Sequence, residues 1–194
     1  MDKIVNVKES ERKYRVSAFA KDSLWDREFI IYQWYDEKEK ERKTKLIIDL
    51  LSLTSKWVRV TKKRLSNSDS TKTVEYLSSS EVDIDKFVGE KFVCKRRSLK
   101  GKISIDHFVR SNGSCRFLLE DEGDPSLTDN FARENNMIIE DVTDDINYRN
   151  TNMTTVFTEE DKRNMLFLMD ALFYPNCSYN KLTINKLADV NGGG

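Results

Sequence analysis

The sequence is poor in the residues that most often carry thiol and imidazole chemistry. Its 194 residues include one histidine, His107, and three cysteines, Cys94, Cys115 and Cys177. A single histidine excludes a histidine-rich metal site and argues against a Ser-His-Asp triad. The cysteines show neither metal-ligand spacing nor an even number for pairing, so we expect reduced thiols in an intracellular protein.

Glycine, proline and long apolar runs are scarce as well. The seven glycines and two prolines form neither a Walker nor a Rossmann pattern. No signal peptide and no apolar run of membrane length is present, which predicts a cytoplasmic protein without a membrane partner. Charged residues make up 34% of the chain but sum to a net charge of zero, so there is no global basic field for nucleic acid. Any polyanion site must therefore arise from local sorting of charges.

Much of the chain shows the alternation of apolar and polar residues that is typical of β-strands. Eight strands are predicted, with one short helix from residue 79 or 80 to residue 88; the strands are 6–17, 28–36, 44–50, 56–65, 71–77, 91–98, 103–109 and 115–122. Consecutive antiparallel strands favour a closed barrel, because closure removes exposed edges. Several strands pair an apolar face with a charged one, as where Lys95 and Arg97 share a face. We expect an α+β fold, mainly β: an eight-stranded antiparallel closed β-barrel with a polar lumen and flanking helices.

The first predicted strand carries the most informative charges. Alternation places Glu9, Glu11, Lys13 and Arg15 on one face. Two carboxylates beside two cations fit a metal ion with a polyanion, because carboxylates bind the metal and the cations bind phosphate oxygens. A solvated sheet face is the commoner explanation for this segment taken alone.

This segment resembles the Glu-x-Glu-x-Lys signature of the triphosphate tunnel metalloenzymes, the CYTH family. Further matches to that family follow in order along the chain: 32–35, 93–97, 103–108, 117–122 with a second Glu-x-Glu, and 140–150, which resembles a segment just after the barrel in bacterial members. The resemblance covers about residues 5 to 153 and is closest to bacterial tripolyphosphatases. It implies a tunnel domain over 1–153 and a C-terminal helical extension with a flexible tail over 154–194.

The resemblance also implies roles for individual side chains. Mg²⁺ or Mn²⁺ would be held by Glu9, Glu11, Glu120 and Glu122. The phosphates would be bound by Lys13, Arg15, Lys45, Arg59, Lys63, Lys95, Arg97 and Arg116. The residues expected to act in catalysis are Lys63 and a carboxylate that orients the attacking water, either Glu75 or Glu120. By alternation we expect Lys63, not Lys62, to face the lumen, together with Arg59.

Departures from the family pattern keep several functions open. Ile47 and Thr73 occupy positions where the family usually has phosphate-binding arginines. Hydrolysis of inorganic tripolyphosphate is the favoured function because of the match over 140–150. The alternatives are a nucleoside or RNA 5′-triphosphatase, an adenylate cyclase, or a non-catalytic protein that binds a nucleotide or polyphosphate. Nucleic acid would be a partner only through a 5′-triphosphate end.

The end of the chain predicts a helix outside the resemblance. Thr158, followed by three acidic residues, is typical of an N-cap with an acidic first turn. Apolar residues then recur from Met165 to Phe173. We expect this helix to pack on the barrel or plug one tunnel mouth, with a dimer contact as the alternative.

Overall fold

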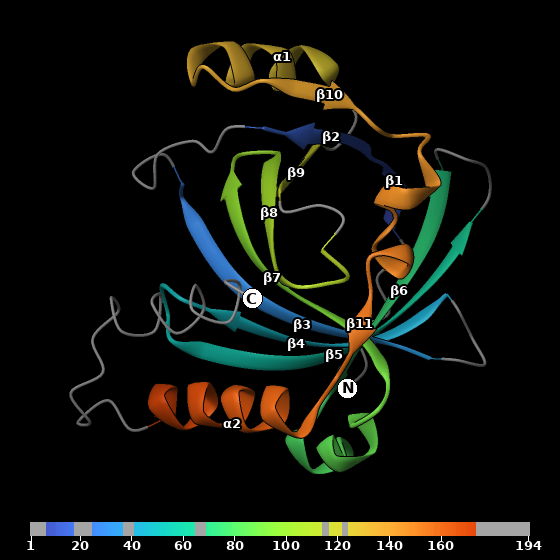
Figure 1. Ribbon diagram of the computed structural model, residues 1–194, viewed down its shortest axis with the longest axis vertical. Coiled ribbons are helices and arrows are strands. Elements are labelled where there is room, and N and C mark those ends of the chain that lie inside the picture. Colours follow the sequence, from blue (N-terminus) through green and yellow to red (C-terminus); the bar gives the residue numbers. More distant parts are fainter. Residues whose placement is uncertain are drawn as a thin grey trace.

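A mainly antiparallel sheet with two α-helices makes up the described part of the chain. The computed structural model describes residues 7–17, 25–36, 41–64, 69–113, 117–121 and 124–173 (Figure 1). Its strands are β1 (Val7–Ser10), β2 (Arg12–Val16), β3 (Arg27–Tyr35), β4 (Arg42–Asp49), β5 (Thr54–Arg64), β6 (Asp69–Leu77), β7 (Lys91–Lys100), β8 (Ile103–Arg110), β9 (Phe117–Asp121), β10 (Ile139–Asp141) and β11 (Thr155–Val156). The helices are α1 (Pro125–Glu134) and α2 (Glu159–Phe173), with short 3₁₀ turns between strands. The predicted α+β, mainly β class is confirmed.

The sheet curves around an interior but is not closed by hydrogen bonds. Its strand order is β1-β6-β5-β4-β3-β7-β8-β9-β2-β10, with β11 paired to β7. The predicted first strand is divided at Glu11: its first half, β1, pairs with β6 and its second half, β2, pairs with β9. The other edge of β2 is taken by β10. The predicted closed barrel is therefore only partly matched: the first strand reaches both β6 and β9, but it is interrupted at Glu11, so the described hydrogen bonds form an open ladder that ends at β10.

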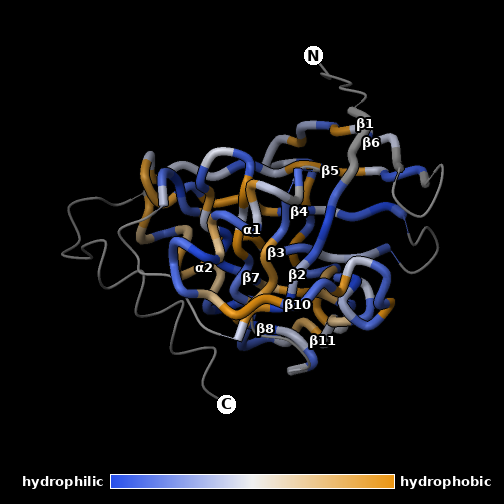
Figure 2. Tube along the Cα trace, turned by 90° about the horizontal axis from the view of Figure 1, so that it is seen from above, coloured by the Kyte–Doolittle hydropathy of each residue, from blue (hydrophilic) through white to orange (hydrophobic). Residues whose placement is uncertain are grey.

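The apolar core lies on the outer face of the sheet, beneath the helices. Polar and apolar residues alternate along the strands, which the changing colours in Figure 2 follow. Under α2, Trp34 and Trp57 belong to a cluster with Leu46 and Phe92, and α2 contributes Met165, Leu168 and Leu172 to the same cluster. The helix therefore packs on the sheet, which is the first of the placements expected from the sequence.

Both helices begin at side-chain caps. Thr158 Oγ1 accepts a hydrogen bond from Asp161 N at 3.1 Å, and an Asp161 oxygen accepts one from Thr158 N at 3.0 Å, which confirms the predicted cap of α2. Asp124 caps α1, a helix that the alternation did not predict. Among the described residues, no helix has the length and apolar content to cross a membrane.

The predicted helix from residue 79 or 80 to 88 is wrong in kind. Two short 3₁₀ turns, Ser79–Glu81 and Ile84–Phe87, occupy this stretch. Val82 and Asp83 between them have extended backbone angles, which interrupt helical hydrogen bonding. Phe87 nevertheless stacks on Trp34 with the ring centroids 4.5 Å apart, so the segment still covers the outer core.

One end of the interior is filled by apolar side chains. Val93, Phe108 and Leu118 come from the inner faces of β7, β8 and β9 and form a cluster with Val142 and Met153 of the segment after β10. Backbone hydrogen bonds join this segment to β2, from Val142 N to Lys13 O at 2.9 Å. The polar part of the interior is therefore a cavity bounded on one side by this cluster.

Candidate anion-binding site

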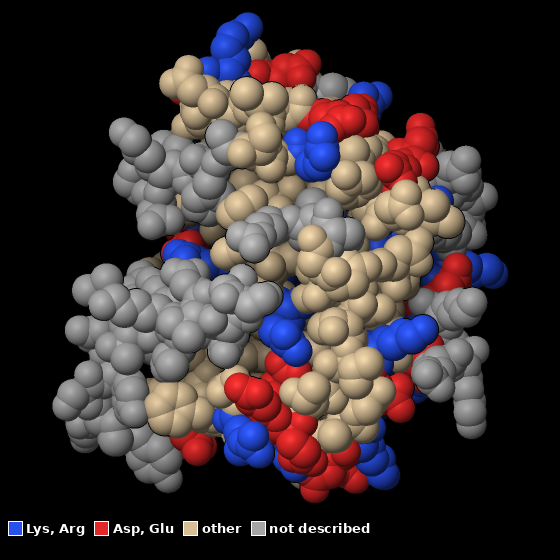
Figure 3. Space-filling model, viewed as in Figure 1, with Lys and Arg blue, Asp and Glu red and all other residues tan. Residues whose placement is uncertain are grey.

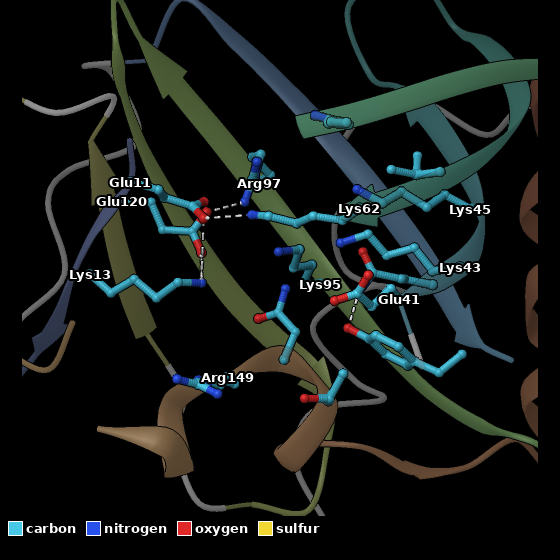
Figure 4. Close-up of a pocket in the computed structure, with 16 residues that line it drawn as sticks. Glu11, Lys13, Glu41, Lys43, Lys45, Lys62, Lys95, Arg97, Glu120 and Arg149 are labelled. Carbon is cyan, nitrogen blue, oxygen red and sulfur yellow. Dashed lines mark hydrogen bonds and ion pairs between the residues drawn. The ribbon is translucent and has the colours of Figure 1, made fainter. Parts of the chain in front are cut away.

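A cavity of about 200 Å³ lies within the curved sheet (Figure 4). Its cationic lining consists of Lys13, Lys43, Lys45, Lys62, Lys72, Lys95, Arg97 and Arg149. Its carboxylates are Glu11, Glu41 and Glu120, and the remaining lining residues are Gln33, Tyr35, Val60, Asn150 and Thr151. On the outer face seen in Figure 3, acidic and basic side chains are instead interspersed. Cations are thus sorted into the interior of a chain without net charge, as an anion site requires.

Part of the cavity wall is a network of ion pairs built on cross-strand neighbours. Arg97 of β7 faces Asp106 of β8, and Lys13 of β2 faces Glu120 of β9. Asp106 is fully buried and accepts from Arg97 Nε and Nη2, both at 2.6 Å, and from Lys95 Nζ. Glu120 accepts from Lys13 Nζ at 2.9 Å and from Arg97 Nη2 at 2.5 Å. These contacts hold three cationic side chains in fixed positions at the cavity.

The same contacts keep the two carboxylates ionised. Burial opposes ionisation, but the charges of Lys13, Arg97 and Lys95 outweigh it and hold the pKa of Glu120 well below its usual value. The pKa of Asp106 is lowered in the same way, with burial opposed by Arg97 and Lys95. The network therefore keeps its negative charges throughout the neutral pH range.

The opposite part of the wall has cations without counter-charges. Lys43 and Lys45 of β4 point into the cavity, and neither has an ion-pair partner among the described residues (Figure 4). Burial, followed by the charges of Lys62 and Lys95, lowers the pKa of Lys43 to about 7. Burial and the neighbouring cations, first Lys43 and then Lys95, hold the pKa of Lys45 well below its usual value. Uncompensated ammonium groups of this kind are stabilised when an anion enters.

The amide oxygen of a residue beside these lysines also lacks a hydrogen-bond donor among the described residues. Gln33 of β3 is fully buried, and its Oε1 accepts no hydrogen bond from the part of the chain that the structure describes, while its Nε2 donates to the Tyr35 hydroxyl. A buried acceptor without a donor costs free energy unless a ligand or water supplies one. The wall formed by β3 and β4 is therefore the incomplete side of the cavity.

The structure gathers some of the predicted site residues and separates others. Those that line the cavity are Glu11, Lys13, Lys45, Lys95, Arg97 and Glu120. Arg116, Glu122 and the side chain of Glu9 lie outside the described residues. Arg15 shares the face of Lys13 but does not line the cavity, and its exposed guanidinium pairs with Glu140, with Nη2 2.5 Å from the carboxylate. The predicted placement is wrong for Arg59, Lys63 and Glu75, which do not line the cavity.

The errors in β5 and β6 have one physical cause. Trp57 packs in the outer core, so Arg59 and Lys63, which share its face, point away from the cavity. Arg59 pairs with its cross-strand neighbour Glu75 at 3.0 Å. Val60 and Lys62 face inward instead. The sequence contains this signal, because a residue as large and apolar as Trp57 favours the buried face, and one residue's orientation fixes which face every other side chain of the strand takes.

This register predicts opposite results at two adjacent lysines. Lys62→Ala should weaken tripolyphosphate binding by about 1.5–3 kcal/mol, roughly tenfold or more, because a charge-assisted contact in the cavity is lost. Lys63→Ala, its exposed neighbour, should leave the dissociation constant nearly unchanged. Titration calorimetry of both variants measures this, and equal losses would show that the strand register is wrong.

Sequence reasoning missed several residues of the site. Lys43 and Glu41 fall outside the predicted strand 44–50, although Lys43 alternates with Lys45 along β4. Arg149 belongs to a segment that carried the family resemblance but no assigned role. Asp106 was read only as part of a strand motif, and its burial beneath Lys95 and Arg97 depends on β7 and β8 being paired in register.

Comparisons with known proteins show similar solved structures but do not assign the chain to a family. No family model matches the chain, and no curated protein matches it. Seven chains of solved structures match, and two of them are of NE1496. One is of the hypothetical protein NE1496, with 15% identity, a TM-score of 0.45, and coverage of 76% of this chain and 96% of that one. The other is of the inorganic triphosphatase NE1496, with 16% identity, a TM-score of 0.41, and coverage of 76% and 93%.

Proposed function

We propose that this protein is a metal-dependent hydrolase of triphosphates, with inorganic tripolyphosphate as its substrate. The proposal rests on one observation: cations line a cavity within the curved sheet, and two of them, Lys43 and Lys45, have no counter-charge among the described residues. A compact polyanion supplies that charge. Val60 is the one aliphatic residue in the described lining, so the cavity itself favours an inorganic chain over an organic group.

The ion-pair network would position the donors before substrate arrives. Asp106 holds Lys95 and Arg97, and Glu120 holds Lys13 and Arg97, so these side chains need little reorganisation to meet phosphate oxygens. In-line attack of water on a terminal phosphorus spreads charge over the transferred group, and the fixed cations stabilise that charge. Because the pKa of Glu120 is held low, this carboxylate would orient the water rather than remove its proton.

Two described carboxylates fit a divalent metal ion. Glu11 and Glu120 both line the cavity, and carboxylate oxygens suit Mg²⁺ and Mn²⁺. One Glu11 oxygen lies 4.0 Å from Lys13 Nζ and 3.8 Å from Lys62 Nζ, beyond hydrogen-bond distance, so it retains capacity for a ligand. No group of three histidine, cysteine or acidic side chains comes together in the described part of the chain. When bound, the ion would neutralise phosphate charge.

Phosphate release tests this function. The wild-type protein with Mg²⁺ or Mn²⁺ should release phosphate from tripolyphosphate faster than from ATP, thiamine triphosphate or triphosphorylated RNA. Glu120→Gln should reduce the rate by at least about a hundredfold, the scale of losing a group that acts at the reacting atoms. Asp26→Asn, at an exposed ion pair with Lys100, is the matched control and should keep the wild-type rate. Faster turnover of an organic triphosphate would contradict the proposal that inorganic tripolyphosphate is the substrate.

A non-catalytic binder is the second candidate. Both oxygens of Glu120 already accept from Lys13 and Arg97, which leaves this carboxylate committed to cations. A binder would hold tripolyphosphate tightly and release no phosphate with either metal. Calorimetry and phosphate release on the same sample separate the two candidates.

A further inference from the structure

The segment after β10, residues 142–153, borders the cavity at the end that apolar side chains fill. Val142 and Met153 belong to that apolar cluster. Both ends of the segment are held by backbone hydrogen bonds, from Val142 N to Lys13 O at 2.9 Å and from Asn112 N to Met153 O at 3.0 Å. Side chains that this segment turns toward the cavity therefore extend from a fixed backbone.

Three consecutive residues of this segment, Arg149, Asn150 and Thr151, line the cavity. Tyr148 packs against the apolar cluster, and Figure 4 shows Arg149 beside the turns of this segment and away from Lys45. The guanidinium of Arg149 has no ion pair or hydrogen bond with a described residue, and the buried Oδ1 of Asn150 accepts no hydrogen bond from one. Because an amide turned by half a rotation presents its NH2 group in the same place, both side chains can donate to the oxygens of one anion.

We propose that Arg149 binds the terminal phosphate of a linear polyphosphate, with Asn150 donating to the same group, so that the site recognises the end of a phosphate chain. The assignment rests on the proposed function in taking this cavity as the triphosphate site. A guanidinium presents two parallel N–H groups that match two oxygens of one phosphate, which the ammonium groups of the cavity lysines do not. A terminal phosphate has three free oxygens, enough for both side chains, whereas an internal phosphate has two.

The apolar cluster prevents a phosphate chain from continuing past Arg149. The cluster at this end of the interior contains the buried side chains of Val93, Phe108 and Leu118. These close-packed side chains offer a phosphate neither space nor a hydrogen bond. A chain in the cavity can therefore extend toward Lys45 of the opposite wall, but its other end has to stop at Arg149.

Two ligands separate recognition of a chain end from general attraction of phosphate: linear tripolyphosphate and cyclic trimetaphosphate, a ring that has no terminal group. Calorimetry of the full-length protein in EDTA measures both affinities without metal-dependent turnover. Arg149→Lys keeps the positive charge but loses the fork, so it should weaken linear binding by about three- to tenfold, the scale of one lost hydrogen bond, and leave cyclic binding nearly unchanged. Arg149→Ala should weaken linear binding by about tenfold or more, because a charge-assisted contact is lost.

An exposed arginine provides the matched control. Arg163→Ala removes the same charge from an exposed position of α2 that does not line the cavity, and it should leave both affinities nearly unchanged. Because the side chain of Arg149 has no partner among the described residues, its variants should melt at the wild-type temperature without ligand. A lower melting temperature would mean that Arg149 holds the segment in place, and it would count against the assignment.

The outcomes distinguish this assignment from the proposed function. Equal weakening of linear and cyclic binding in Arg149→Lys, or no weakening of linear binding, would overturn the role of Arg149 alone. Absence of tripolyphosphate binding by the wild-type protein would overturn the proposed function as well.

Discussion

Asp106→Asn is expected to lower the free energy of unfolding by about 3–5 kcal/mol, the cost of leaving a buried charge without its partner. Asp106 is fully buried, and so nearly is Lys95, which is 2% exposed. Without the carboxylate, Lys95 and Arg97 repel each other inside a cavity that already contains an excess of cations. Urea denaturation at pH 7 measures the change in stability.

The matched control for this variant is an aspartate in an exposed ion pair. Asp26 lies 2.9 Å from Lys100 at the surface, and Asp26→Asn should leave the stability nearly unchanged because water screens such pairs. Tripolyphosphate should restore more stability to Asp106→Asn than to the wild type, because the anion replaces the missing charge. A stability loss no larger than that of Asp26→Asn would show that Asp106 does not hold the cavity cations.

The second large effect is a pH dependence of tripolyphosphate binding. An anion in the cavity raises the pKa of Lys43 from about 7, so binding above pH 7 must take up a proton. Below pH 7 the amine is already charged, and that proton uptake disappears. Between pH 7.5 and 9 the affinity should therefore fall by up to about tenfold per pH unit for each proton taken up, with Lys45 contributing in the same direction.

Calorimetry in two buffers with different ionisation enthalpies counts these protons directly. Lys43→Arg should reduce the uptake, because a guanidinium stays protonated throughout this range. Binding with no proton uptake at pH 8 would mean that Lys43 and Lys45 keep their charges in the empty cavity, or that the anion binds elsewhere.

Alternation predicted most strands because side-chain period is a local property. The segments that became β3 to β9 were all expected, and their apolar faces do lie under helices or loops. Closure of the sheet was predicted only in part, because it depends on which strand pairs with each edge of β2, and β10 comes from a distant part of the chain. Sequence alone does not fix such long-range choices.

Residues of the candidate site could be predicted where a charged side chain lies in a strand whose inward-facing and outward-facing positions are clear from the sequence. Lys95 and Arg97 were placed correctly because Phe92 and Cys94 of β7 lie in the outer core, which turns the alternate positions 95 and 97 toward the cavity. In β5, placing Arg59 and Lys63 in the lumen put Val58 and Val60 on the outer face, whereas Trp57 is the residue that lies in the outer core. The larger side chain has more apolar surface to bury, so its position should decide parity when the two signals conflict.

A crystal structure with tripolyphosphate and Mn²⁺ tests the central claim most directly. We expect the phosphorus atoms inside the cavity, with phosphate oxygens within hydrogen-bond distance of Lys43, Lys45 and Arg97. We also expect the anomalous signal of manganese beside Glu11 and Glu120. Tripolyphosphate bound on the outer surface, or an empty cavity in crystals grown with millimolar ligand, would contradict the assignment of this cavity as the triphosphate site.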